Sequence, residues 1–325
     1  LHRAATSLLA LAIVGMPVAG AGPALASTVG GEAAAVVPCL TDMAARMQGQ
    51  DTSVPKWRQH SDTSAVTHED LQALPANETR TDYVNREVRP RLAARVNIPV
   101  YVHVIKGKHR GERNPASRGR VRGLIATLNR GMAGGQSTFS TPLRFRFFIK
   151  KIDYTKNDGW YHAYIFGPRD QAAKRHLHRG NARTLNLYIN GGGPRGTPVL
   201  GWARFPWQYQ HTPGLDSVSV NVAGLRGGSA HGFNLGDTVI HETGHWLGLY
   251  HTFQGGCSVQ GDLVADTPSE AEPSFGCSGR RDTCASDPGF DPVRNFMDYS
   301  LDSCMNRFSP GQAQRMDAAF EKWRR

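Results

Sequence analysis

The sequence predicts an α+β fold, and three observations lead to that class. Strand-like and helix-like stretches alternate from about residue 96 to residue 250. The chain then becomes rich in Gly, Pro, Asp and Cys, without regular periodicity, until about residue 309. One more helical stretch follows. With 325 residues and 39% hydrophobic content, the chain has enough apolar surface for a buried core.

The first 26 residues are typical of an export signal. His2 and Arg3 give a short basic start, residues 8–18 are apolar, and residues 24–26 (Ala-Leu-Ala) suit signal peptidase. A membrane anchor is the alternative, but the apolar run is short and is interrupted by glycine and proline. We therefore expect a signal peptide over residues 1–26 and a secreted, extracellular protein without a membrane span.

Residues 27–92 differ from the rest of the chain, because small and polar residues dominate and alternation is weak. Such a segment can bury little apolar surface of its own. We expect a propeptide here and the folded domain over residues 93–325. Cleavage after Arg91 or Arg95 would separate the two, because the first strand begins soon after them.

Five stretches are predicted to be strands, since β-branched and aromatic residues are concentrated in them. They are residues 98–105, 143–152, 184–189, 200–205 and 217–222. The second stretch alternates as an antiparallel or edge strand does. Pro206 ends the fourth stretch and places it at a sheet edge.

Three stretches are predicted to be helices. Residues 116–132 carry apolar side chains at helical spacing, and residues 235–250 contain the histidine motif described below. The third helix continues through Phe320, with Ser309 as its N-cap and Pro310 in its first turn.

The net charge of +11 raises the possibility of a nucleic-acid partner. However, the lysines and arginines are scattered, and no helix-turn-helix, zinc-finger or RNA-binding pattern accompanies them. We interpret the charge as a solvated basic surface and expect no nucleic-acid partner.

Three histidines lie at a spacing that suits a metal ion. His241 and His245 are one helical turn apart, so their imidazoles project from the same face. Gly248 can end the helix with a positive φ, which lets His251 bring a third nitrogen to the same point. Three neutral nitrogens leave a fourth zinc position open for water, as catalytic zinc sites require.

Glu242 leaves the helix about 100° round from His241, beside the metal. There it can take a proton from a zinc-activated water that attacks a carbonyl. The alternative is that the histidines only pack or cap a helix. A purely metal-binding role would leave Glu242 unexplained.

Met297 and Tyr299 lie about fifty residues downstream, in the irregular part of the chain. A methionine in a tight turn can form an apolar floor beneath the histidines. A tyrosine hydroxyl two residues later can reach the zinc or the substrate oxyanion. Ordinary core packing is the alternative for both residues.

With these residues, the chain resembles the pappalysin (cytophagalysin) family of metzincin zinc metalloendopeptidases. Beyond the histidine motif, the resemblance rests on Leu235-Gly236, residues 245–253, Cys304-Met305-Asn306 and residues 308–312. It covers roughly residues 96–325. It implies a metzincin-type zincin with a twisted mixed sheet, mostly parallel, a backing helix and an active-site helix. An N-terminal subdomain would reach about residue 251, and a disulfide-linked C-terminal subdomain would span residues 252–325. The substrate cleft would lie between the two subdomains.

Five cysteines are present, and four of them cluster in the last quarter of the chain. An oxidising compartment would pair these four, but the sequence leaves three pairings open. The family resemblance suggests Cys257 with Cys284 and Cys277 with Cys304. Cys39 is left over. In a zymogen of this family its thiolate could occupy the open zinc position; an incidental thiol in a discarded leader is the alternative.

The resemblance also implies two further sites. Residues 261–268 are similar to the family's calcium-binding loop, with Asp262, Thr267 and the Ala265 carbonyl as candidate ligands and Asp266 as a further candidate. A surface turn is the alternative. Asp302 would lie near the pocket beyond the scissile bond and favour Arg or Lys there, unless it is a solvated loop residue.

The main functional hypothesis is therefore a secreted zinc endopeptidase made as a zymogen. Its partners would be a protein or peptide substrate and its own propeptide. Two other hypotheses are a zinc amidase acting on cell-wall peptides and a binding module that keeps zinc for structure.

Overall fold

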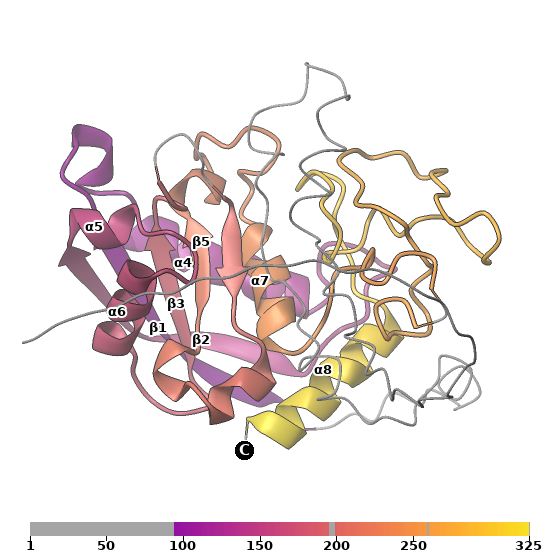
Figure 1. The fold of residues 1–325 in the computed structure, drawn as a ribbon, viewed down its shortest axis with the longest axis horizontal. Coiled ribbons are helices and arrows are strands. Elements are labelled where there is room, and N and C mark those ends of the chain that lie inside the picture. The colour runs from indigo at the N-terminus through magenta and orange to yellow at the C-terminus, as the bar shows by residue number, and fades with distance from the viewer. Residues whose placement is uncertain (1–93, 195–198, 259, 325) are drawn as a thin grey trace, which may run out of the picture. The chain divides into compact units, whose positions relative to one another are not determined.

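Five strands form one mixed sheet in the order β2-β1-β3-β5-β4 (Figure 1). The computed structural model describes residues 94–194, 199–258 and 260–324. The predicted signal peptide, propeptide and Cys39 lie outside these described residues. The strands are β1 (Val96–Lys106), β2 (Phe145–Lys156), β3 (Leu185–Asn190), β4 (Gly201–Ala203) and β5 (Val218–Asn221). All five predicted strands are thus confirmed, with shifted ends.

Four of the strands run parallel, and only β4 is antiparallel to its neighbour β5. The predicted twisted mixed sheet is of this type. The strand predicted over residues 143–152 is at a sheet edge, as expected, but it pairs with β1 in parallel. The antiparallel option was therefore wrong. Helix α4 (Arg118–Met132) lies between β1 and β2 in the chain. This crossover connection allows β2 to run parallel to β1.

The other α-helices are α5 (Asp158–Tyr161), α6 (Pro168–Leu177), α7 (Thr238–Trp246) and α8 (Pro310–Trp323). Short 3-10 helices span Arg110–Glu112, Pro206–Gln210, Pro213–Leu215 and Val222–Gly224. The sequence did not predict α5 or α6. The first is a single turn, and α6 has too few apolar residues for a clear helical period. Across the described ranges, no helix combines the length and apolar character that a membrane crossing requires.

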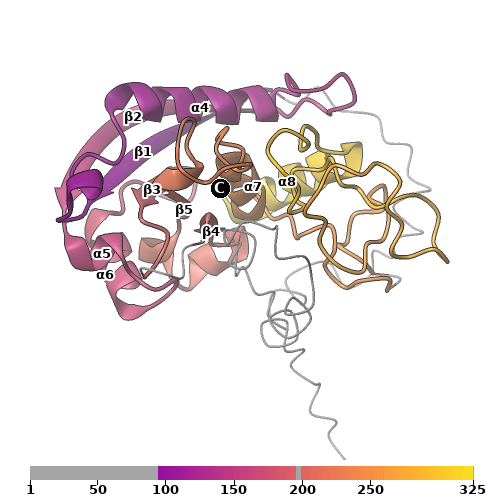
Figure 2. The ribbon, with the colours of Figure 1, turned by 90° about the horizontal axis from the view of Figure 1, so that it is seen from above.

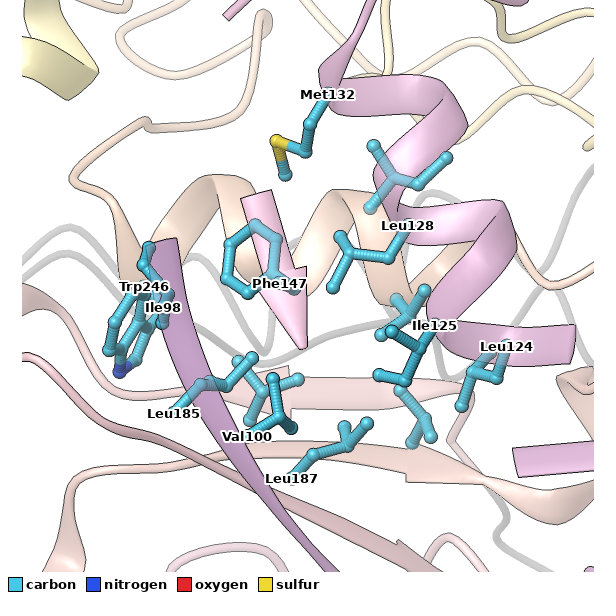
Figure 3. Close-up of a cluster of buried hydrophobic side chains, with 14 of the residues drawn as sticks. Ile98, Val100, Leu124, Ile125, Leu128, Met132, Phe147, Leu185, Leu187 and Trp246 are labelled. Atoms are coloured by element: carbon cyan, nitrogen blue, oxygen red, sulfur yellow. The ribbon is translucent and has the colours of Figure 1, made fainter. Parts of the chain in front are cut away.

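The two faces of the sheet bury different layers. Alternate side chains of β1 and β3, such as Val100 and Leu187, pack with Leu128 of α4 and Trp246 of α7 (Figure 3). On the other face, Tyr188 packs against Leu177 of α6. Figure 2 shows α4 on one side of the sheet and α5 and α6 on the other. The central helix α7 packs against β4, β5 and α4, so the sheet and its backing helix fix its position.

After α7 the chain has little regular structure until α8, as predicted. Two disulfides cross this region, Cys257–Cys284 and Cys277–Cys304, and confirm the pairing that the family resemblance suggested. The last helix begins as expected, because the Ser309 hydroxyl accepts a hydrogen bond from the Gln312 amide at 3.1 Å. Asp266 links the region to this helix. It accepts hydrogen bonds from the Ser309 hydroxyl (2.6 Å) and the Gly311 amide (2.8 Å).

Removing the second disulfide with the pair Cys277→Ser and Cys304→Ser should lower the free energy of unfolding by about 2–4 kcal/mol. The bridge joins residues 27 positions apart, so its removal increases the conformational entropy of the unfolded chain. Urea unfolding of the mature protein measures the loss. Ser303→Ala, an exposed change beside Cys304, is the matched control. Equal urea midpoints for the two proteins would contradict this prediction.

Candidate metal centre

The three predicted histidines come together at the end of α7. His241 and His245 lie on one face of the helix, and the chain turns back at Gly248, whose φ is 102°. The Nε2 atom of His245 lies 3.1 Å from Nε2 of His241 and 3.1 Å from Nε2 of His251. All three side chains are buried. The structure therefore directs three ring nitrogens at one point.

The tautomers of two of these histidines follow from their other ring nitrogens. Nδ1 of His241 donates to the Phe296 carbonyl at 2.7 Å, and Nδ1 of His245 donates to the Leu249 carbonyl at 2.7 Å. Since carbonyls only accept, the protons are on Nδ1 and the Nε2 lone pairs face each other. Such convergence is repulsive unless a cation lies between the nitrogens.

The donor set fits zinc. Zn–N bonds of about 2.0–2.1 Å in a tetrahedron place the nitrogens about 3.3–3.4 Å apart, close to the separations seen here. Carbonyls that orient metal-binding histidines through Nδ1 are the usual second layer of such sites. His241, His245 and His251 would therefore hold the ion.

Glu242 is buried next to the edge strand β4. A Cβ atom at Gly201 would lie only 2.5 Å from Oε1 of Glu242, so the carboxylate occupies the space that a side chain there would take. This contact was not predicted. A glycine within a strand was the available signal, since it often marks a close approach of another group.

Met297 lies directly beneath α7. It is fully buried, and a Cβ atom at Gly244 would be 2.5 Å from its sulfur. The Met297 carbonyl accepts the Thr252 amide at 3.2 Å, and the preceding Phe296 carbonyl accepts His241. The turn thus contacts the histidine motif through both side chain and backbone.

Tyr299 is brought to the same centre. Its hydroxyl lies 3.3 Å from Nε2 of His251, and its ring packs against His251 and Phe253. A hydroxyl at this place can donate to a group that approaches the three nitrogens.

Buried carboxylates hold this turn in place and were not anticipated from the sequence. Asp298 accepts hydrogen bonds from the Ser274 and Tyr299 amides and from the Ser300 hydroxyl. Glu270 accepts the Thr252 hydroxyl at 2.8 Å and pairs with Arg281 at 2.9 Å. Burial raises the pKa of both carboxyl groups.

Asp302 is buried next to the start of α7. Its Oδ2 accepts the backbone amides of Leu235 (2.8 Å) and Gly236 (3.1 Å). Burial, with a smaller effect from the Asp237 carboxylate, raises the pKa of Asp302 to about 7. In this structure Asp302 therefore orders the segment that enters the helix.

Two of the candidate calcium ligands lie together. Asp262 accepts the Val264 amide at 3.0 Å and the Thr267 hydroxyl at 2.7 Å, and both Asp262 and Thr267 are buried. Ala265 lies in the same turn. Asp266, the further candidate, instead contacts the start of α8 as described above.

Arg324 anchors the C-terminal end of α7, at Trp246. The sequence did not reveal this role. Its guanidinium lies 3.4 Å over the Trp246 ring, donates to the Trp246 carbonyl, and pairs with both oxygens of Asp216 at 3.0 Å. Trp246 Nε1 also donates to Asp216 at 3.1 Å. Trp246 follows His245 directly in the chain, so this network helps to fix the backbone that carries His245.

Comparisons with known proteins agree with this centre. Residues 168–321 match the peptidase M43 family, described as pregnancy-associated plasma protein-A. An extracellular metalloprotease of Pyricularia oryzae is 40% identical over 237 residues, which are 72% of this chain and 79% of that protein. One of Neurospora crassa is 38% identical over 240 residues, covering 71% of this chain and 77% of that protein.

Solved structures with the same fold include two forms of a Tannerella forsythia protein. Mature mirolysin in complex with a cleaved peptide is 27% identical, with a TM-score of 0.59, over 70% of this chain and 92% of that chain. Promirolysin is 25% identical, with a TM-score of 0.63, over 81% of this chain and 94% of that chain.

Proposed function

Because the chain belongs to the pregnancy-associated plasma protein-A (pappalysin) family of zinc metalloendopeptidases, we propose that it hydrolyses peptide bonds with Glu242 as general base. His241, His245 and His251 are its proposed zinc ligands. The observation that carries the proposal is the convergence of three Nε2 atoms: that of His245 lies 3.1 Å from that of His241 and 3.1 Å from that of His251.

Each residue has a distinct task in this mechanism. When bound, zinc supplies a Lewis acid that polarises a carbonyl and makes water more acidic. The Glu242 carboxylate takes the proton from the attacking water and delivers it to the leaving amine. The Tyr299 hydroxyl donates to the oxygen that gains negative charge. The Met297 side chain fills the space beneath the histidines and excludes water from it.

The substrate is proposed to be an extended peptide that adds beside β4. This strand is the last in the sheet order and is antiparallel to β5, and it also contacts Glu242. Backbone pairing with an edge strand is a general way to bind extended peptides. It would present the scissile bond to the general base.

Casein cleavage by the purified mature protein tests the endopeptidase proposal. Cleavage should stop when a chelator removes the metal and should return when zinc is restored. Absent or chelator-insensitive cleavage would contradict the proposal. Absent cleavage would favour the amidase or the zinc-stabilised binding module, and cell-wall peptides as substrate would then separate these two.

We propose that the Asp302 carboxylate favours Arg or Lys after the scissile bond. Asp302→Asn should lower kcat/KM for Arg and Lys peptides in a peptide library, with a much smaller change for a Leu peptide. The Leu peptide is the control, because Asp302 also orders residues 235–236 and a general loss would affect every substrate. Equal losses for all peptides would assign Asp302 a structural role only.

Secretion as a zymogen is proposed, with residues 1–26 as signal peptide and residues 27–92 as propeptide. The extracellular relatives and the promirolysin match support it. Cys39 is the proposed ligand that blocks zinc in the precursor. N-terminal sequencing of the secreted form locates the cleavage, and a Cys39→Ser precursor should be active before processing. A precursor that stays inactive would remove Cys39 from this role.

Calcium is the second proposed cofactor, held by Asp262, Thr267 and the Ala265 carbonyl. Calcium at 100 times its Kd should raise the free energy of unfolding by about 2.7 kcal/mol. Asp262→Asn should abolish this gain in thermal unfolding experiments. A wild-type Tm that does not respond to calcium would refute the site.

A further inference from the structure

A second group of metal-donor side chains lies at the ends of β1 and β2. The donor atoms of His109, Glu112 and Asp158 are all within 4.8 Å of one another. His162 completes the group, with Nε2 3.1 Å from Glu112 Oε1 and 4.0 Å from Asp158 Oδ1. The group thus combines two imidazoles with two carboxylates.

The parallel pairing of β1 and β2 explains why these residues meet. The strands end side by side, at Lys106 and Lys156. The 3-10 helix Arg110–Glu112 follows β1 and α5 follows β2, so the two turns lie next to each other. In Figures 1 and 2, α5 is well separated from α7. The group is therefore distinct from the histidine centre.

Backbone contacts orient the two carboxylates. Glu112 Oε2 accepts the His109 amide at 3.1 Å, and this directs Oε1 towards His162. Asp158 Oδ1 accepts the Lys108 amide at 3.1 Å. The side chains of Glu112, His162 and Asp158 are 15%, 19% and 32% exposed. The group is thus partly ordered and still accessible to an ion from solvent.

We propose that His109, Glu112, Asp158 and His162 form a second metal site, for a divalent transition ion such as Zn²⁺. Mixed nitrogen and carboxylate donors suit zinc, whereas calcium prefers all-oxygen sites. His109 is exposed, so its ring can turn towards the ion. The ion competes with the contact between His162 and Glu112 and with the Lys108 ammonium, which lies 3.4 Å from Asp158. Affinity is therefore lower than at the histidine centre.

Binding at this site also affects residues that precede β4 in the chain. The Tyr161 carbonyl at the end of α5 accepts the Gly191 amide at 3.0 Å. The Gly192 carbonyl then accepts the Val199 amide at 2.8 Å, two residues before β4 begins. An ion that fixes α5 therefore also fixes Gly191 and, through Gly192, Val199.

Zinc binding to the full chain carrying Glu242→Ala, which prevents self-cleavage, tests the proposal. Isothermal titration should show two zinc ions per chain, the second one weaker. His109→Ala should weaken the second ion at least about tenfold, because even outer-layer substitutions at metal sites reach this loss. His162→Gln should do the same. His211→Ala, an exposed histidine elsewhere, is the matched control and should leave both ions unchanged.

A Lys108→Gln variant adds an opposite expectation. It removes the competing ammonium, so the second ion should bind more tightly, while the first is unaffected. One zinc per Glu242→Ala chain, or a second zinc that persists unchanged when His109→Ala or His162→Gln is added, would overturn the proposal. If His162→Gln disturbs the fold by circular dichroism, His109→Ala decides alone, since its exposed side chain contributes no core packing.

Discussion

Replacing Glu242 by Gln is expected to lower kcat/KM for a peptide substrate by a factor of about 10²–10⁴. The amide has nearly the shape of the carboxylate and still fits against Gly201, but it cannot take the proton from water. The three histidines are unchanged, so zinc should stay bound. Steady-state kinetics on one fluorogenic peptide, with the zinc content of the same sample, measures both effects.

Glu272→Gln is the control, because this glutamate is exposed and pairs only at the surface with Arg281. It should retain the wild-type kcat/KM. An active Glu242→Gln enzyme would remove the general base from the mechanism. Loss of zinc together with activity would mean that Glu242 supports the metal rather than the proton transfer.

Replacing Arg324 by Ala is expected to lower the free energy of unfolding by about 3–5 kcal/mol. The substitution leaves the Asp216 carboxylate buried without its bidentate partner and the Trp246 carbonyl without two of its donors. A buried charge that loses its partner is far more costly than a broken surface pair. Denaturant unfolding of the mature protein measures the loss.

Lys322→Ala provides the comparison, since Lys322 is exposed and lies in the same helical end. It should change the free energy of unfolding by less than about 0.5 kcal/mol. Arg324→Lys should be nearly as damaging as Arg324→Ala, because an ammonium cannot form the planar bidentate contact or the stack on Trp246. Similar urea midpoints for Arg324→Ala and Lys322→Ala would contradict the anchoring role.

The metal centre was the most predictable part of the molecule. Its chemistry is encoded at short range, because helical geometry alone places His241 and His245 on one face. Gly248 adopts the positive φ that the motif required. The strands were predictable as well, since their β-branched residues alternate between two buried faces. Their ends were not, because these depend on where neighbouring strands stop pairing.

The supports of that centre could not be predicted, because they join residues far apart in the chain. Arg324 reaches Asp216 across 108 positions, and Glu242 lies against a glycine of another strand. Such contacts depend on tertiary packing rather than on periodicity. Helix α6 was missed for a different reason: Asp170 and Lys174 form a buried ion pair on a helix that its sequence makes look polar.

Anomalous diffraction at the zinc absorption edge, from a crystal of the mature protein, tests the central claim most directly. A strong peak is expected among His241, His245 and His251, about 2.0–2.1 Å from each Nε2 atom. The peak should vanish after chelation. No peak at this position in zinc-loaded crystals, or one bonded through Glu242 in place of a histidine, would contradict the proposed centre.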